Sequence, residues 1–398
     1  SAEQAMTSTM SDTRFHPSSG RLPSIGIVST FPPTACGLAT FAAALARGFE
    51  TVGVSDIGIV RCDSDGVSTS DHRVVGGLIN GDTESIADAA AVLNTFDCVV
   101  LQHEYGIFGG HDGDDVLRLL DRVDVPVITT LHTIPLHPSA HQSKVLEGVI
   151  ARSDRSVTMT MAARERLLSQ YSVHPQGVTT IPHGATLPPP VAPPSPRNPT
   201  VLTWGLLGPG KGIEWVIDAL AAVSDVVPPI RYVVAGRTHP KVAARDGEAY
   251  RESLMERARR HGVADRVIFD ETYRSVPELL ELVCSSHAVV LPYDSSDQIT
   301  SGVLVDAVAA GTPVISTTFP HSVELLRSGA GVLVPHKDPV AIADALRMVV
   351  TRPNVAAAMR SVATQLAPLH SWPNVAQRYT ELALDLTQSA PVPIAQSA

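Results

Sequence analysis

The sequence predicts an α/β fold of two doubly wound, Rossmann-like domains that face a central cleft. Short apolar runs alternate with helical patterns along the chain, and this alternation is typical of a parallel sheet covered by helices on both faces. A proline-rich segment divides the alternation into two similar halves. The chain of 398 residues is also too long for one ordinary hydrophobic core.

Four buried strands are expected in the first half. They are "SIGIV" (Ser24 to Val28), "CVVLQ" (Cys98 to Gln102), "VPVITTLH" (Val125 to His132) and "SVTMT" (Ser156 to Thr160). The helical pattern "FAAALARGF" follows the first strand after a turn that contains glycine. Because the runs are apolar throughout, we expect these strands to be buried on both faces of the sheet.

The linker between the halves is "LPPPVAPPSPRNP", Leu187 to Pro199, with seven prolines in thirteen residues. Proline fixes φ and lacks the N–H that a helix or a central strand needs, so the segment predicts a stiff, extended connection.

The second half shows the same alternation of strand and helix patterns. Its expected strands are "TVLTWG" (200–205), "IRYVVAG" (230–236), "AVVLPY" (288–293) and "TPVIST" (312–317). A helix is predicted by apolar residues at i, i+3, i+4 and i+7, namely Ile213, Val216, Ile217 and Leu220. A second helix, "SGVLVDAVAAG", is expected to begin at Ser301 as N-cap and to end at Gly311.

The last helical pattern, "SWPNVAQRYTELALDL" (Ser371 to Leu386), follows a break at Pro368. It either belongs to the second domain or crosses back to the first. The expected divisions are a disordered lead (1–22), an N-terminal Rossmann-like domain (23–188), the linker (189–199), a C-terminal Rossmann-like domain (200–370), and the final helix with its tail (371–398).

Composition and charge exclude several classes of protein. The apolar fraction of 44% fills two cores, and the net charge of −10 argues against a nucleic-acid binder, which needs a basic face. We find no apolar run long enough to span a membrane, no signal pattern and no basic amphipathic helix. The four cysteines are far apart in or near apolar segments, so we expect reduced thiols and a cytoplasmic protein.

Two segments of the second half suggest phosphate binding. "GLLGPGKG", Gly205 to Gly212, resembles a P-loop but ends in glycine, where a Ser or Thr hydroxyl would hold Mg²⁺. Lys211 and the loop N–H groups therefore either meet phosphate without a metal or form an ordinary tight turn. Thr300, Ser301 and Gly302 open a helix directly after a strand, which places N–H groups and a positive dipole end at the cleft.

Together these segments resemble retaining GT-B glycosyltransferases of the family-4 type. The resemblance includes "QITSGVLVDAVAAGTPVIS", "WGLLGPGKGIEWVIDAL" and "TIPHG" (Thr180 to Gly184), and runs from about Ile25 to Leu386. "STFPPTACGLATF", "LQHEYGIFGG" and "LHTIPLHPSAHQ" are similar to one bacterial, mannosyltransferase-like subgroup. The resemblance implies a GT-B fold with an N-terminal acceptor domain and a C-terminal nucleotide-sugar domain.

The resemblance also implies roles for residues of the second domain. Its pair of acids eight residues apart falls on Gln298, near the donor sugar, and on Asp306, at the ribose. Lys211 and Gly210 would contact the diphosphate with Thr300 to Gly302, whereas Leu206 replaces the family's arginine. Arg237, after the strand "YVVAG", is the candidate to supply that missing charge.

In the first domain, Gly37 and Leu38 match the loop that approaches the diphosphate and the acceptor. His132, at the end of a strand, matches a histidine that lines the transferred sugar, although such a histidine is often only part of the core. His103 and Glu104 end another strand, so we place them on the acceptor side of the cleft. The expected catalytic residues are His132, Lys211 and Gln298.

Metal and dinucleotide sites are not expected. Pro135 and Pro138 disrupt any helical register that would bring His132, His137 and His141 together on zinc. The Asp-x-Asp pattern in "HDGDD" (His111 to Asp115) recurs in "CDSDG", so it carries no metal signal, and "TACGLATF" has only one of the glycines that an NAD site needs.

The resulting prediction is a retaining glycosyltransferase that needs no cofactor and no metal. It transfers a sugar, mannose from GDP-mannose being preferred, to a hydroxyl of a soluble oligosaccharide or small glycoside. The alternatives are a UDP-glucose-dependent glucosyltransferase, a UDP-sugar 2-epimerase of the same fold, and a sugar-nucleotide sensor without catalysis.

Overall fold

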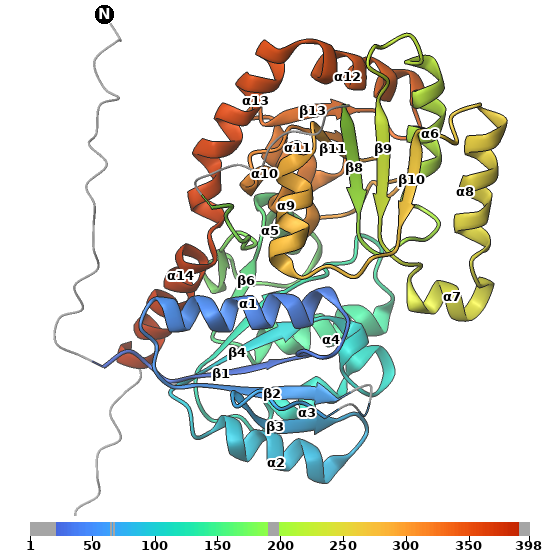
Figure 1. Ribbon diagram of the computed structural model, residues 1–398. Helices are drawn as coiled ribbons and strands as arrows, with labels where there is room; N and C mark the ends of the chain where they lie inside the picture. The colour runs from blue at the N-terminus through green and yellow to red at the C-terminus, as the bar shows by residue number, and fades with distance from the viewer. Residues whose placement is uncertain (1–20, 64–65, 67, 190–198, 390–398) are drawn as a thin grey trace, which may run out of the picture.

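The computed structural model describes residues 21–63, 66, 68–189 and 199–389 as two stacked α/β domains (Figure 1). Each domain has one parallel sheet with helices on both faces, as predicted. Most of the expected lead, most of the linker and the final tail lie outside the described residues. Of the lead, the structure describes Arg21, which pairs with Asp97, and Leu22, which packs against the first core.

The first sheet has seven strands in the order β3-β2-β1-β4-β5-β6-β7, and every neighbouring pair is parallel. From edge to edge they are β3 (Val74–Ile79), β2 (Ile57–Asp63), β1 (Ile25–Ser29), β4 (Cys98–His103), β5 (Val127–Leu131), β6 (Arg155–Thr158) and β7 (Val178–Thr180). The four predicted strands are β1, β4, β5 and β6. The strand order reverses between β1 and β4, so ligands are expected outside the carboxyl ends of these two strands.

The side chains of β1 alternate between two hydrophobic clusters, which explains why both faces of this sheet are covered. Ile25 and Ile27 pack with α1 (Gly37–Thr51) and α14 (Trp372–Ser389), whereas Val28 packs on the opposite face. That opposite face is covered by α2 (Thr83–Leu93), α3 (Asp115–Leu120) and α4 (Ala140–Ala151). The remaining elements of the domain are α5 (Met161–Gln170), η1 (Tyr105–Ile107), η2 (His111–Gly113) and η3 (Pro175–Gly177).

The second sheet has six parallel strands in the order β10-β9-β8-β11-β12-β13. They are β10 (Val267–Asp270), β9 (Arg231–Ala235), β8 (Thr200–Trp204), β11 (Ala288–Leu291), β12 (Val314–Thr317) and β13 (Gly331–Val334). The four strands predicted for this half are β8, β9, β11 and β12. The strand order reverses between β8 and β11, which is the second position where parallel sheets bind ligands.

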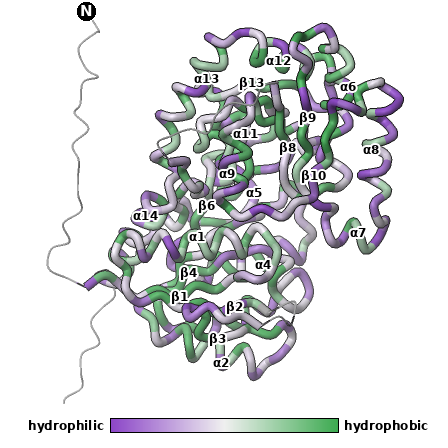
Figure 2. Tube along the Cα trace, viewed as in Figure 1, coloured by the Kyte–Doolittle hydropathy of each residue, from purple (hydrophilic) through white to green (hydrophobic). Residues whose placement is uncertain are grey.

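Helices of the second domain also form two layers. One hydrophobic cluster joins the sheet to α6 (Ile213–Ala222), α8 (Ala249–Arg260) and α12 (Pro339–Thr351). The other joins it to α9 (Val276–Ser285), α10 (Gly302–Ala309), α11 (Pro320–Leu326) and α13 (Pro353–Leu366). Figure 2 shows hydrophobic residues along the central strands, while α7 (Pro240–Asp246) and α8 are largely hydrophilic at the outer edge.

The predicted ends of α10 are confirmed. The Ser301 hydroxyl caps the helix by accepting from the Leu304 N–H at 3.3 Å, and Gly311 follows the C-cap with φ at 70°. An L side chain rarely adopts this left-handed conformation, so glycine ends the helix here.

The chain crosses between the domains twice, and the two crossings run side by side. The Ala185 N–H donates to the His370 carbonyl at 2.6 Å, and the His370 ring bonds the His183 carbonyl at 3.1 Å. After η4 (Ala367–His370), α14 returns to the first domain and packs along α1. Figure 1 shows α13 and α14 descending one side of the molecule from the second domain to the first.

Trp372 packs where the two crossings meet α1, because two glycines leave space for it. A Cβ at Gly184 would lie 2.3 Å from the Trp372 ring, and one at Gly48 would lie 2.8 Å from its carbonyl oxygen. The Phe41 ring packs against Trp372 with ring centroids 5.0 Å apart. This packing ties α1, the first crossing and the start of α14 into one unit.

Gly184→Ala is expected to lower the free energy of unfolding by about 1–3 kcal/mol, because the added methyl group overpacks against Trp372. Gly177→Ala is the control, since a Cβ there meets no atom within 4 Å. The measurement is urea unfolding of both variants followed by circular dichroism. Equal midpoints for the two variants would contradict the close packing of Trp372.

Candidate active site

A cavity of about 1120 Å³ lies between the domains. From the first domain it is lined along α1 by residues that share one helix face: Gly37, Leu38, Thr40, Phe41, Ala44, Arg47, Gly48 and Thr51. On the other side α9 contributes an apolar wall of Val276, Leu279, Leu280 and Val283. Figure 1 shows α9 facing α1 across the boundary between the domains.

The polar end of the cavity gathers several of the predicted site residues. Those that line it are Gly37, Leu38, Glu104, His132, Thr300, Gly302 and Asp306. Glu104 and His132 directly follow β4 and β5. The others lie at the start of α1, which is the helix after β1, or at and within the first turns of α10, which is the helix after β11. The positions where the strand orders reverse therefore face the same cavity, as expected for ligand sites on parallel sheets.

The N-terminus of α10 presents free hydrogen-bonding groups to the cavity. Within the described part of the chain, the N–H groups of Gly302 and Val303 and the hydroxyl of Thr300 have no partner. The Ser301 N–H instead donates to His321 Nδ1 at 2.9 Å, which holds the start of the helix in place. Unpaired N–H groups and the positive end of the helix dipole suit an anionic ligand.

Asp306 lies one turn further along α10 with its carboxyl group on the cavity. No partner of this carboxyl group is found among the described residues, and burial raises its pKa to about 7. A carboxyl group poised near neutrality can accept hydrogen bonds from ligand hydroxyls, which would favour its charged form.

Two neutral histidines line the cavity from the first domain. Burial lowers the pKa of His132 to about 3, with further effect from the nearby His183 and His103, and burial lowers the pKa of His183 to about 4. His132 Nε2 donates to Gln102 Oε1 at 2.7 Å, since an amide oxygen only accepts, and its Nδ1 keeps a lone pair. These rings therefore provide hydrogen bonds rather than positive charge.

Glu104 and the aromatic residues complete this end of the cavity. Glu104 accepts from the Thr133 hydroxyl, which orients the carboxylate. The Phe41 ring lies about 5 Å from the rings of His132, His183 and Trp372, edge to face in each case. No role was predicted for Phe41, His183 or Trp372. In the sequence these residues stand out only as members of segments already described, such as "TIPHG" in the family resemblance and "SWPN" at the start of the last helix.

The other predicted site residues lie outside the cavity wall. His103 is fully buried between Tyr105 and Phe108, so it belongs to the core of the first domain. Arg237 is exposed and donates to the Glu271 carbonyl at 3.2 Å. Ser301 is the buried cap of α10.

Gly210, Lys211 and Gln298 lie on loops that lead toward the cavity. Lys211 is half-buried with its Nζ 4.7 Å from the centroid of the Tyr293 ring, and burial lowers its pKa. Its ammonium has no carboxylate partner in the described residues. The Gln298 amide donates to the carbonyl of Thr300, the residue that opens onto the cavity.

The structure explains why Gly212 excludes a P-loop. Its φ is 69°, and a Cβ at this position would lie 1.8 Å from the Pro292 carbonyl oxygen. A Ser or Thr that could hold Mg²⁺ therefore does not fit at the start of α6.

Part of the chain matches a known protein family. Residues 198–352, from β8 through α12, match the family described as "Glycosyl transferases group 1". The D-inositol 3-phosphate glycosyltransferase of Saccharomonospora viridis is 28% identical over 68% of this chain and 66% of its own length. That of Segniliparus rotundus is 28% identical over 49% of this chain and 46% of its own length. These alignments span less than two thirds of the relatives.

Solved structures resemble the whole of this fold. A glycosyltransferase of Rickettsia africae has a TM-score of 0.72 at 12% identity, covering 92% of this chain and 99% of its own. The sucrose-phosphate synthase of Thermosynechococcus elongatus has a TM-score of 0.72 at 18% identity, covering 92% of this chain and 100% of its own. HepE of Anabaena, solved with UDP-glucose, has a TM-score of 0.70 at 17% identity, covering 91% of this chain and 100% of its own. The predicted GT-B fold is confirmed.

Asp306→Asn is expected to remove one contribution that makes stability fall as the pH rises from 4 to 7. The native carboxyl group keeps its proton up to about pH 7, whereas the unfolded one loses it near 3.8, so this group stabilises the folded state less at the higher pH. The lowered pKa values of the buried His132 and His183 act in the opposite direction, so the quantity to compare is the difference between wild type and variant at each pH. The slope attributable to one such group is at most about 1.4 kcal/mol per pH unit. Urea unfolding at several pH values measures it, and parallel curves for the two proteins would refute the raised pKa.

Proposed function

We propose that this protein is a retaining glycosyltransferase that uses a nucleotide-diphosphate sugar. The observation that carries the proposal is the cavity between the domains, which joins the free N-terminus of α10 and Asp306 to Glu104 and His132. The match of residues 198–352 to group 1 glycosyl transferases supports it.

In this proposal the diphosphate binds at the start of α10. The N–H groups of Gly302 and Val303 and the Thr300 hydroxyl donate to its oxygens, and Asp306 accepts from the ribose hydroxyls. Lys211 has no carboxylate partner to compete with phosphate, and it would leave the Tyr293 ring to meet the leaving group. Such preorganised donors stabilise the charge that develops as the diphosphate departs.

The transferred sugar lies toward the first domain in this proposal. His132 Nδ1 accepts from a sugar hydroxyl, and Glu104 contacts the acceptor. The bond between the anomeric carbon and the phosphate oxygen breaks while the acceptor oxygen attacks from the same face. The acceptor proton passes to an oxygen of the departing diphosphate, so no carboxylate nucleophile is required. Gln298 supports this step by holding the Thr300 carbonyl.

GDP-mannose is the donor that we propose first, from the subgroup resemblance of the sequence. UDP-glucose is the second candidate because HepE, which shares the fold, was solved with UDP-glucose. For the acceptor, the relatives named D-inositol 3-phosphate glycosyltransferase favour a small polyol or its phosphate over a lipid. No helix among the described residues combines the length and apolar character needed to cross a bilayer.

The first experiment is thermal unfolding in EDTA with GDP, UDP, ADP and NAD in parallel. A nucleotide at ~100 times its dissociation constant stabilises by about 2.7 kcal/mol, which is expected to raise the melting temperature of the domain that binds it by about 5–10 °C. Selectivity for GDP supports GDP-mannose, and selectivity for UDP supports the second candidate. A shift with NAD alone would overturn the proposal, and turnover of a UDP-sugar without any acceptor would indicate an epimerase instead.

Lys211→Ala is expected to lower kcat/KM for sugar transfer by about 10²–10³, the usual cost of removing one group that stabilises developing charge. Lys241→Ala, which removes an exposed ammonium on α7, serves as the control and should change the rate less than about twofold. Far-ultraviolet circular dichroism checks that both variants fold. Turnover of Lys211→Ala close to that of the control would eliminate the role of Lys211.

A further inference from the structure

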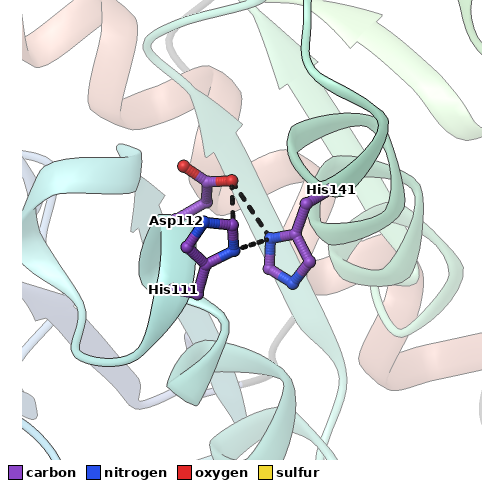
Figure 3. Close-up of side chains that lie close together, drawn as sticks. All are labelled: His111, Asp112 and His141. Atoms are coloured by element: carbon purple, nitrogen blue, oxygen red, sulfur yellow. Dashed lines mark hydrogen bonds and ion pairs between the residues drawn. The ribbon is translucent and has the colours of Figure 1, made fainter.

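Three metal-binding side chains converge on the surface of the first domain, outside the cavity described above. His111 and Asp112 belong to η2, in the loop after β4, and His141 lies in the first turn of α4. Figure 3 shows the two imidazole rings and the carboxylate turned toward one another. None of the three residues lines the cavity between the domains.

The distances among the three ligand atoms suit a single metal ion. His111 Nδ1 lies 2.8 Å from His141 Nδ1, which lies 3.0 Å from Asp112 Oδ2; the third side of the triangle is 3.6 Å. Ligand atoms of a tetrahedral zinc site are about 3.3 Å apart, because each is ~2.0–2.1 Å from the metal. The triangle has a circumradius of about 1.85 Å, so one point just off its plane reaches all three atoms at that distance.

A second carboxylate lies on the far side of the His141 ring. Asp114 Oδ2 is 3.4 Å from His141 Nε2, the ring nitrogen that faces away from His111 and Asp112. A carboxylate in this position commonly orients a metal-bound histidine through its second nitrogen, so Asp114 suits the role of an outer partner of the site.

The backbone of the loop is shaped to present Asp112. Its φ of 51° is left-handed, a conformation that few residues other than glycine adopt and that aspartate tolerates better than most. The flanking Gly110 and Gly113 have φ values of 84° and 74°, and a Cβ on Gly113 would lie 2.5 Å from the Tyr105 carbonyl oxygen. The loop therefore depends on glycines to turn the carboxylate toward His141.

We propose that His111, Asp112 and His141 bind one divalent transition-metal ion, with Zn²⁺ as the best match. Two imidazoles and one carboxylate suit Zn²⁺ and the neighbouring first-row metals rather than Mg²⁺ or Ca²⁺, which prefer oxygen ligands. The His111 side chain is 73% exposed, so solvent can supply the fourth ligand. The site differs from the excluded set of His132, His137 and His141. His111 and Asp112 do belong to the "HDGDD" segment that was expected to carry no metal signal, and only the fold brings His141 to them.

Such an ion would clamp the loop after β4 to the beginning of α4. These segments directly follow Glu104 and His132, which line the cavity from the first domain. The Tyr105 hydroxyl already joins the same segments by donating to the Gln142 carbonyl at 3.1 Å. The ion would thus stabilise one wall of the cavity without taking part in the proposed transfer chemistry, and the proposal does not depend on that function.

The test is titration of the chelator-treated full chain with Co²⁺, followed by visible absorption. The expected result is strong ligand-field absorption that saturates at one equivalent, because four-coordinate Co²⁺ absorbs far more than the hydrated ion. His141→Ala and Asp112→Ala are expected to lose it. His137→Ala removes an exposed histidine from the same connection and should retain it.

A second measurement distinguishes a metal site from a plain network of ion pairs. Equimolar Zn²⁺ is expected to raise the melting temperature of the wild type and of His137→Ala by about 2–4 °C relative to EDTA, and to leave His141→Ala unchanged. If His141→Ala is destabilised equally in Zn²⁺ and in EDTA, and Co²⁺ gives no absorption, the cluster is an ion-pair network and the proposal is overturned.

Discussion

The paired crossings between the domains are the constraint on which the rest of the structure depends. The bond from the Ala185 N–H to the His370 carbonyl holds the two connections together, and Trp372 packs beside them only because Gly184 and Gly48 have no side chains. A second contact supports this arrangement, since the Glu324 carboxylate of the second domain accepts from the first N–H groups of α5. The carboxyl edges of both sheets consequently face the same cavity.

Because both sheet edges face the cavity, the two domains contribute different kinds of groups to it. The second domain contributes the open start of α10, which suits an anion, and the Asp306 carboxyl group, which can accept from ligand hydroxyls. The first domain contributes the neutral imidazoles of His132 and His183. Phe41 packs against both of these rings, so α1 positions the polar end as well as lining the cavity along its length. Burial keeps the histidines neutral, and charge is left to the phosphate-binding groups and Glu104.

Glycines occupy several positions at this site where a side chain would collide with a backbone or a ring. A Cβ at Gly212 would collide with the Pro292 carbonyl oxygen, and one at Gly302 would lie 3.0 Å from the His183 ring. Gly184 likewise leaves room for the ring of Trp372. At Gly212 this steric requirement also excludes the metal-binding hydroxyl of a P-loop, because no Ser or Thr fits there. The same principle operates at Gly113, where a close approach to Tyr105 shapes the loop that presents Asp112.

The sequence by itself determined the two parallel sheets, the helix that begins at Ser301 and the absence of a P-loop, because periodicity, capping and glycine chemistry are local. It also identified strand ends as the source of site residues, since parallel strands place their carboxyl ends at one edge. Only the tertiary structure decided which of these side chains reach the cavity. His103 is buried in the core and Arg237 is exposed, although the first ends β4 and the second lies just after β9. Contacts between distant segments, such as His111 with His141, depend on packing that no local pattern encodes.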